Sequence, residues 1–239
     1  MGKTTFMLSI ALNMAMHGNP VAIFSLEMSE KQLFIRLLSN ICNLPLGEIR
    51  YKDELSDSEI AQISDSMEKL QGLPLYIDDT LSLSVTKLRA KAERLVREHG
   101  VKMIAIDYLQ LMSDGENSTP RDSDISKITH SLKELSKELD ISVIASLFLC
   151  GKHEDKTGEI ERPGLSDIRK IGPIEQDAQA ICLIHRPEYY VCDQTDNSGD
   201  DIQGKAELIY AKCPNRTGIV DMLFCKEYLR FEILNRKKQ

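Results

Sequence analysis

Hydrophobic positions along the chain follow two alternating periodicities. Segments with apolar residues at spacings of three and four, typical of amphipathic helices, alternate with short continuous apolar runs, typical of buried strands. The helical spacing covers residues 4–17, 29–43, 55–70, 84–99 and 125–139. The apolar runs cover residues 21–26, 75–78, 103–107, 141–149 and 180–185. This alternation predicts an α/β fold with a mostly parallel central sheet flanked by helices.

The last third of the chain has a different pattern. Residues 150–172 and 187–204 are rich in polar residues, glycine and proline and are expected to be loops. Residues 206–212, 219–224 and 228–234 have strand-like composition, and a turn is expected at residues 215–218. These segments predict antiparallel strands at the C-terminus. Because the sequence contains no internal repeat, low-complexity tract or obvious linker, we expect a single domain over residues 1–239.

Composition narrows the function classes. The chain has 239 residues, 42% of them hydrophobic, and a formal net charge of −7. A protein that coats nucleic acid with its whole surface is usually basic, so any DNA binding here must come from a local patch. The six cysteines form no CxxC pair, which favours reduced thiols in a cytosolic protein. No apolar run approaches the roughly 20 residues that a membrane span needs, so no membrane partner is expected.

The chain opens with Gly2-Lys3-Thr4-Thr5 leading directly into a predicted helix. This matches the end of the phosphate-binding motif GxxxxGK[ST], in which backbone N–H groups surround phosphates at a helix N-terminus. In that interpretation Lys3 would reach the β- and γ-phosphates of a nucleotide, and the Thr4 hydroxyl would bind Mg²⁺. The alternative is an ordinary start of an N-terminal helix.

Two carboxylates follow predicted strands. Asp107 ends the apolar run 103–107. The Walker B aspartate of P-loop ATPases, which holds Mg²⁺, likewise stands at the end of an apolar strand. Glu27 follows the run 21–26, where a glutamate near a γ-phosphate could act as general base toward water. The alternatives are a strand-ending aspartate without a role and an exposed glutamate that favours a helix dipole.

Three motifs, FSLEMS at residues 24–29, IDYLQLM at 106–112 and IEQDA at 174–178, resemble the C-terminal motor domain of the DnaB-type replicative helicases, which belong to superfamily 4. The resemblance implies a RecA-like P-loop fold, ATP and Mg²⁺ as cofactors, a homo-hexameric ring, and single-stranded DNA in its central channel. It also implies primase and a helicase loader as further partners, and a bacterial, cytoplasmic, nucleoid-associated location. The residues expected to bind the nucleotide are Gly2, Lys3, Thr4, Thr5, Asp107 and Gln176. Those expected to hold the metal are Thr4 and Asp107, and those expected to be catalytic are Glu27, Lys212 and Arg216.

The sequence departs from this family at several positions. Phe148 stands where the family has a glutamine that senses the γ-phosphate, and a phenyl ring cannot make that hydrogen bond. Pro214 stands at the position of the arginine finger, with Arg216 two residues later. Lys170 reverses the charge of a family glutamate, and residues 150–170 carry no net charge. We also expect that the first part of the phosphate loop, the family's N-terminal domain and its linker are absent.

The sequence therefore supports three hypotheses. The first is an ATP-dependent helicase motor that unwinds duplex DNA in the 5′→3′ direction during replication. The alternative is a degenerate or truncated RecA-like module that binds nucleotide or partner subunits without productive hydrolysis. The third is a RecA-like ATPase of recombination or signalling, against which the motifs at residues 106–112 and 174–178 argue.

Overall fold

The computed structural model describes residues 2–51, 54–115, 124–149, 162–190 and 202–234. The chain divides into two compact units. The first, which we call the α/β unit, contains residues Thr4–Phe148 and Glu227–Arg230. The second, which we call the β unit, contains Met1–Lys3, Leu149–Lys226 and Phe231–Gln239.

The α/β unit is built on a parallel sheet. Its strands lie in the order β2-β1-β3-β4 and all neighbouring pairs are parallel. Their bounds are β1 (Val21–Ser25), β2 (Leu75–Asp78), β3 (Met103–Asp107) and β4 (Ser142–Ala145). Ser25 and Asp107 are register partners at the ends of β1 and β3, so the carboxyl ends of the strands meet at one edge. The predicted mostly parallel sheet is therefore confirmed.

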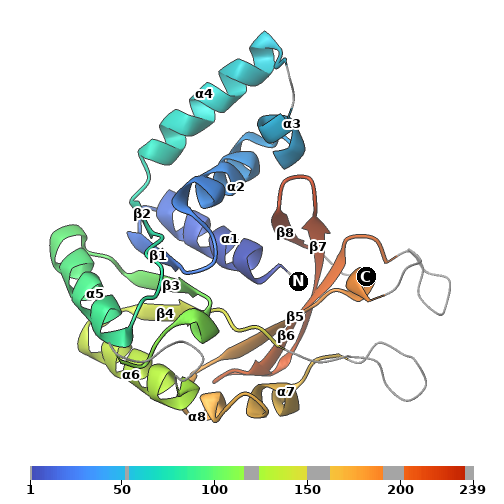
Figure 1. The fold of residues 1–239 in the computed structure, drawn as a ribbon. Coiled ribbons are helices and arrows are strands. Elements are labelled where there is room, and N and C mark those ends of the chain that lie inside the picture. The colour runs from blue at the N-terminus through green and yellow to red at the C-terminus, as the bar shows by residue number, and fades with distance from the viewer. Residues whose placement is uncertain (1, 52–53, 116–123, 150–161, 191–201, 235–239) are drawn as a thin grey trace. The chain divides into compact units, whose positions relative to one another are not determined.

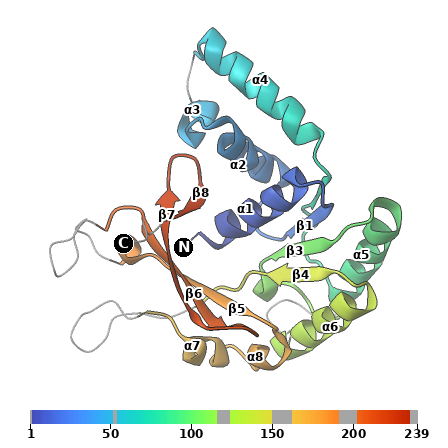
Figure 2. The same cartoon turned by 180° about the vertical axis from the view of Figure 1, so that it is seen from behind.

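Helices cover both faces of this sheet (Figures 1 and 2). On one face α1 (Lys3–Met16) and α2 (Glu30–Cys42) pack against Val21, Ile23 and Met103. On the other face α5 (Val85–His99) and α6 (Ile125–Glu138) pack against the strand residues between them, Ala22, Phe24, Ile104 and Ile106. Successive residues of a strand point to opposite faces, so a strand covered on both sides reads as a continuous apolar run.

The predicted boundaries of these helices hold because their caps are local. The side chain of Ser29 accepts a hydrogen bond from the backbone of Gln32, whose own side chain returns to the Ser29 backbone. α5 follows its cap Ser84 and ends at Gly100, which adopts the left-handed conformation at the C-cap. Helix starts and stops could therefore be read from single residues.

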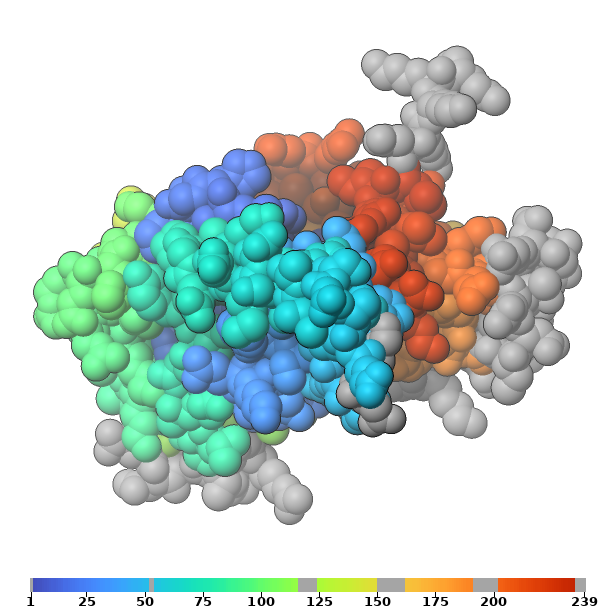
Figure 3. Space-filling view, turned by 90° about the horizontal axis from the view of Figure 1, so that it is seen from above, coloured from blue at the N-terminus to red at the C-terminus, as the bar shows by residue number. Residues whose placement is uncertain are grey.

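Two helices lie at the margin of the α/β unit. α4 (Asp57–Gln71) is capped by Ser56 and forms an exposed ridge, drawn in cyan in Figure 3. α3 (Leu46–Tyr51) was not predicted from the sequence. It contains no buried residue, so the sequence carries no apolar stripe there that would indicate a helix.

The β unit contains an antiparallel sheet, as predicted. Its strands are β5 (Ile181–His185), β6 (Lys205–Lys212), β7 (Gly218–Cys225) and β8 (Arg230–Ile233), in that order. Three short helices lie in segments expected to be loops or left unassigned: α7 (Leu165–Arg169), α8 (Ile174–Asp177) and the 3₁₀ turn η2 (Pro187–Tyr189). None of the helices in the described parts of the chain is long and apolar enough to cross a membrane.

The predicted strand 141–149 is wrong in length, because β4 ends at Ala145. The backbone N–H of Ser146 still donates to Ile106, but the Ser146 carbonyl accepts from the N–H of Leu109. Leu109 opens the 3₁₀ turn η1 (Leu109–Leu111), which follows β3. The hydrogen bonds between β3 and β4 are thus followed by a bond from η1 to Ser146. The Ser146 side chain therefore lies beside Asp107 at the end of β3.

Candidate active site

A buried carboxylate lies at the carboxyl edge of the parallel sheet. Asp107 is 0% exposed. The Thr4 hydroxyl donates to its Oδ2 at 2.5 Å, and the Ser146 hydroxyl donates to its Oδ1 at 2.5 Å. Burying a carboxylate is costly unless its oxygens are hydrogen-bonded, and each oxygen here has a donor. Thr4 and Asp107, which are 103 residues apart in the chain, are therefore brought together as the sequence predicted.

Thr4 lies in the first turn of α1, between Lys3, which is half-buried, and Thr5, which is buried. The first N–H groups of a helix have no partner within the helix and favour anions. Gly2 has φ +86, and a Cβ there would lie 2.8 Å from Cζ of Phe231, so a larger residue does not fit without a shift. The start of this helix therefore combines free N–H donors with a glycine in the left-handed region, and phosphate binding there stays a prediction.

Glu27 lies in the short connection between β1 and α2, where its side chain is exposed. The connection is held on both sides. The Ser25 hydroxyl donates to the Met28 carbonyl at 2.7 Å and accepts from the Met28 N–H at 3.2 Å. Farther on, the N–H of Glu30 donates to a carboxylate oxygen of Asp79, which follows β2, at 2.9 Å. Glu27 is thus an accessible carboxylate on a fixed backbone, at the same sheet edge as Asp107.

A cation on α2 interacts electrostatically with these carboxylates. Arg36 is half-buried, and among the described residues its Nε has no hydrogen-bond partner. Burial lowers the pKa of the Arg36 guanidinium, as does the nearby Arg50, while the charges of Asp107 and Glu27 raise it. Because arginine stays protonated in proteins, Arg36 is a fixed positive charge within electrostatic range of Glu27 and Asp107.

The donor set at the start of α1 fits Mg²⁺. Thr4 Oγ1 and Asp107 Oδ2 are both hard oxygen ligands. Mg²⁺ is usually bound by one or two carboxylates together with substrate phosphates and water, rather than by a cage of protein ligands. Among the described residues there is no group of three or more His, Cys, Asp or Glu side chains that could hold a metal ion.

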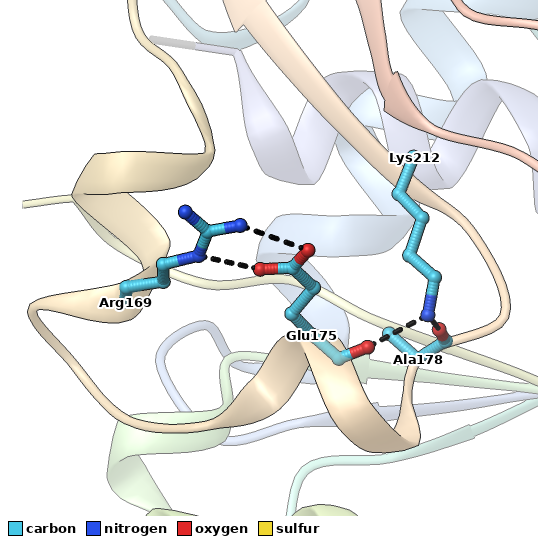
Figure 4. Close-up of polar contacts among 4 residues, drawn as sticks. All are labelled: Arg169, Glu175, Ala178 and Lys212. Atoms are coloured by element: carbon cyan, nitrogen blue, oxygen red, sulfur yellow. Dashed lines mark hydrogen bonds and ion pairs between the residues drawn. The ribbon is translucent and has the colours of Figure 1, made fainter.

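Two further predicted site residues meet in the β unit. Lys212, the last residue of β6, and Gln176, on α8, line a hollow of about 620 Å³ together with Arg169, Gly172, Pro173 and Glu175. Figure 4 shows that the Lys212 ammonium contacts the backbone at the end of α8. Both of its hydrogen bonds go to main-chain carbonyls, of Glu175 and Ala178.

Arg216 lies in the turn that joins β6 to β7, where its side chain is exposed. Pro214 precedes it in the same turn and is also exposed. An exposed arginine at the tip of a hairpin can reach a second molecule. Its predicted role as an arginine finger stays a prediction.

The thiol of Cys213 in this turn is expected to be the most reactive of Cys42, Cys182 and Cys213. The backbone N–H groups of Asn215 and Arg216 lower the pKa of Cys213, whereas burial raises the pKa of Cys42 and of Cys182. Because the thiolate is the nucleophile, alkylation of Cys213 by iodoacetamide should begin at a lower pH and be faster near neutrality. Peptide mapping by mass spectrometry after timed labelling between about pH 6 and pH 9 measures this, and equal rates at Cys182 would contradict it.

Phe148, which stands at the position of the family's glutamine, is 50% exposed. Its backbone is held by the side chain of Gln110, whose Nε2 donates to the Phe148 carbonyl at 2.7 Å. The Phe148 N–H donates to Oε1 of the same side chain at 3.2 Å. The chain is therefore fixed at this position, but the side chain offers no polar group. Most of the segment 150–170 discussed above lies outside the described residues.

Sequence reasoning missed Ser25, Arg36, Asp79 and Ser146. Ser25 and Ser146 lie at or just after the end of a parallel strand, which is a signal that could have identified them, since such ends share one edge. Asp79 directly follows β2 and carries the same signal. For Arg36 the sequence offers only a basic residue in an amphipathic helix, which is ordinarily a solvated position.

Known proteins resemble this chain over nearly its whole length. The sequence profile of the DnaB-like helicase C terminal domain matches residues 1–233. The replicative DNA helicase DnaB of Geobacillus stearothermophilus is 40% identical over 239 residues, covering 99% of this chain and 51% of that protein. The replicative DNA helicase DnaC of Bacillus subtilis (strain 168) is 38% identical, also covering 99% of this chain and 51% of that protein. The chain thus spans about half the length of the curated relatives it matches.

Solved structures give the same picture. The structure of a DnaB-like replicative helicase and its interactions with primase has a TM-score of 0.86 and 30% identity, covering 98% of this chain and 55% of that one. A second solved structure, of an ATPase domain, has a TM-score of 0.86 and 31% identity, covering 98% of this chain and 81% of that one. The resemblance inferred from the three motifs and the RecA-like α/β fold class are both confirmed.

Proposed function

Because this chain belongs to the DnaB-like helicase C-terminal domain family, we propose that it is an ATP-hydrolysing motor that unwinds duplex DNA in the 5′→3′ direction during replication. The observation that carries the proposal is the hydrogen bond between Thr4 and the buried Asp107. It joins the start of a helix to the end of a parallel strand, as a nucleotide-binding site with a metal requires. The residues proposed to bind the nucleotide are Gly2, Lys3, Thr4, Thr5, Asp107 and Gln176.

ATP would bind with its phosphates at the start of α1. The backbone N–H groups of the first turn and the Lys3 ammonium neutralise the β- and γ-phosphates. Thr4 and Asp107 would hold Mg²⁺, which supplies charge neutralisation for the phosphates. Because the Thr4 hydroxyl donates its proton to Asp107, its oxygen lone pairs remain available to a metal ion.

Hydrolysis requires a base for the attacking water. Glu27 would accept a proton as the water oxygen bonds to the γ-phosphorus and the bond to the β–γ bridging oxygen breaks. The fixed backbone around Glu27 supports this role, because a general base must be held at hydrogen-bond distance from its water. Arg36 would stabilise the negative charge that develops in the transition state, since it lies electrostatically close to Glu27 and Asp107.

A second copy of the chain would complete the site. We propose a homo-hexameric ring in which Lys212 and Arg216 of one subunit reach the ATP bound by its neighbour. The exposed position of Arg216 at the hairpin tip supports this, although Pro214 stands where the family has its finger. Single-stranded DNA would pass through the ring, and primase and a loader would be further partners. A cytoplasmic, nucleoid-associated location in a bacterium follows from the same proposal.

Strand separation on forked duplexes tests the proposed function. A fork with a single-stranded 5′ tail and a fork with only a 3′ tail are each incubated with the chain, ATP and Mg²⁺, and strand release is followed by gel. We expect ATP-dependent release that requires the 5′ tail, and no release by Glu27→Gln.

Glu30→Gln is the matched control for this assay. It removes one exposed carboxylate from the first turn of α2, three residues from Glu27, and should unwind normally. Binding of ATP without hydrolysis or unwinding would instead support the nucleotide-binding module. Unwinding that requires a 3′ tail would overturn the proposed polarity.

A further inference from the structure

Lys212 joins two segments of the β unit that are far apart in sequence. Its Nζ donates to the carbonyl of Glu175 and to the carbonyl of Ala178, both at 2.7 Å (Figure 4). These carbonyls lie at the end of α8, where main-chain acceptors have no partner within the helix. One half-buried ammonium therefore donates to two carbonyls of the segment 175–178.

The other cation on this segment is held more weakly. Arg169 forms a two-point ion pair with the side chain of Glu175, at 2.7 and 3.1 Å. The Arg169 side chain is 62% exposed, and exposed ion pairs contribute little to stability because solvent screens them. Lys212 instead bonds the backbone of segment 174–178 at two points, in addition to the segment's own N–H bonds from Gln176 and Ala178.

The position of Lys212 also connects this segment to the β6–β7 hairpin. Lys212 is the last residue of β6, and the turn that carries Arg216 begins directly after it. Gln176 lies between the two carbonyls that Lys212 binds and is exposed. A movement of the Lys212 ammonium would therefore break hydrogen bonds to the segment that carries the exposed Gln176 side chain.

The Lys212 ammonium cannot bind these carbonyls and a phosphate in full at the same time. It lines the hollow of about 620 Å³, through which an anion could reach it. A lysine ammonium is a compact charge with three donors, and a phosphate oxygen is a stronger acceptor than a neutral carbonyl. If Nζ turns toward an anion, both carbonyls lose their charged donor together.

We propose that Lys212 is a positioning residue that fixes segment 174–178 through its two backbone carbonyls and releases this segment when its ammonium binds a phosphate of nucleotide held by a second copy of the chain. The release step rests on the proposed function, whereas the fixing step does not. Lys212 thereby transmits the occupancy of a neighbouring nucleotide site to residues 174–178.

Hydrogen exchange followed by mass spectrometry tests the fixing step without nucleotide. Peptides that cover residues 174–180 report the N–H groups of Gln176 and Ala178, which are bonded to Pro173 and Ile174. Lys212→Met should exchange about tenfold faster in these peptides, the factor that corresponds to one charge-assisted hydrogen bond. Lys212→Arg should restore much of the protection.

Lys205→Met, which changes an exposed lysine at the opposite end of β6, is the matched control and should leave the exchange of residues 174–180 unchanged. Unchanged exchange in Lys212→Met would overturn the proposal.

Addition of adenylyl imidodiphosphate with Mg²⁺ tests the release step. In the wild type we expect slower exchange in peptides from residues 2–16 and faster exchange at 174–180, whereas Lys212→Met should show only the first change. A purely structural lysine would give no nucleotide-dependent change at 174–180, and this result would overturn the release step. Failure of the proposed function is distinguishable, because residues 2–16 would then show no protection at any nucleotide concentration.

Discussion

Glu27→Gln is expected to lower the rate of ATP hydrolysis by about 10²- to 10⁴-fold, the usual contribution of a general base. The amide of glutamine keeps the size of the side chain but cannot accept a proton from water. ATP binding should be unchanged, because Glu27 makes none of the proposed contacts to the phosphates. The rate constant kcat should therefore fall while the Kd for ATP remains within about twofold.

Steady-state phosphate release and equilibrium binding of a fluorescent ATP analogue measure the two quantities. Glu30→Gln, with the same chemical change in the first turn of α2, should behave as wild type in both assays. An equal loss of hydrolysis in both variants would indicate a general electrostatic effect rather than a base. A loss of ATP affinity in Glu27→Gln would place this carboxylate in binding instead.

Asp107→Asn is expected to lower hydrolysis by about 10²- to 10³-fold and to raise the Mg²⁺ concentration needed for half-maximal activity. The substitution removes the charge of Asp107, which is the one charged residue of the two proposed metal ligands, Thr4 and Asp107. Its amide can still accept one hydroxyl proton, but its second group is a donor, so the bonds from Thr4 and Ser146 cannot both persist unchanged. Some loss of thermal stability should accompany the loss of activity, since the Asp107 side chain is fully buried.

Asp78→Asn provides the matched control. Asp78 ends β2 at the same sheet edge and bonds Lys91 and Thr80. Burial alone would raise the pKa of Asp78, but its bonds to Lys91 and Thr80 outweigh burial and lower that pKa below its usual value. Asp78→Asn should therefore lose some stability above the usual pKa of an aspartate, while its Mg²⁺ dependence stays that of wild type. A Mg²⁺ shift in Asp78→Asn as large as that in Asp107→Asn would contradict the assignment of the metal ligands.

Much of the fold could be predicted because its signals are local. Strands covered on both faces are continuous apolar runs, and Ser29, Ser84 and Gly100 mark helix ends by their own conformational preferences. The pairing of Thr4 with Asp107 could also be predicted, since parallel strands bring their carboxyl ends to one edge beside helix N-termini.

Other features could not be read from the sequence because they depend on which partner a side chain meets. The Ser146 hydroxyl bonds Asp107 at a point where β4 has already ended. There the Ser146 carbonyl accepts a hydrogen bond from the N–H of Leu109, outside the strand ladder. The bonds of the Lys212 ammonium to two backbone carbonyls could not be predicted either, and its catalytic role toward a second subunit stays a prediction. No local pattern distinguishes a carbonyl from a phosphate as the acceptor, since a lysine at a strand end is compatible with both.

The departures from the family at Phe148 and Pro214 both bear on the coupling between ATP hydrolysis and DNA binding. The backbone at Phe148 is fixed by Gln110, yet its side chain has no polar group with which to sense a phosphate. If Arg216 replaces the finger, hydrolysis persists despite Pro214. If Gln176 and Lys212 carry the coupling, stimulation by DNA persists despite Phe148.

Steady-state ATP hydrolysis by this chain, measured with and without single-stranded DNA beside a Lys3→Ala variant, distinguishes a motor from a module that only binds nucleotide. We expect turnover in the wild type that DNA increases, and loss of that turnover in Lys3→Ala. Turnover equal in the wild type and in Lys3→Ala, or no turnover in either despite bound ATP, would contradict the claim that this chain is an ATP-hydrolysing motor.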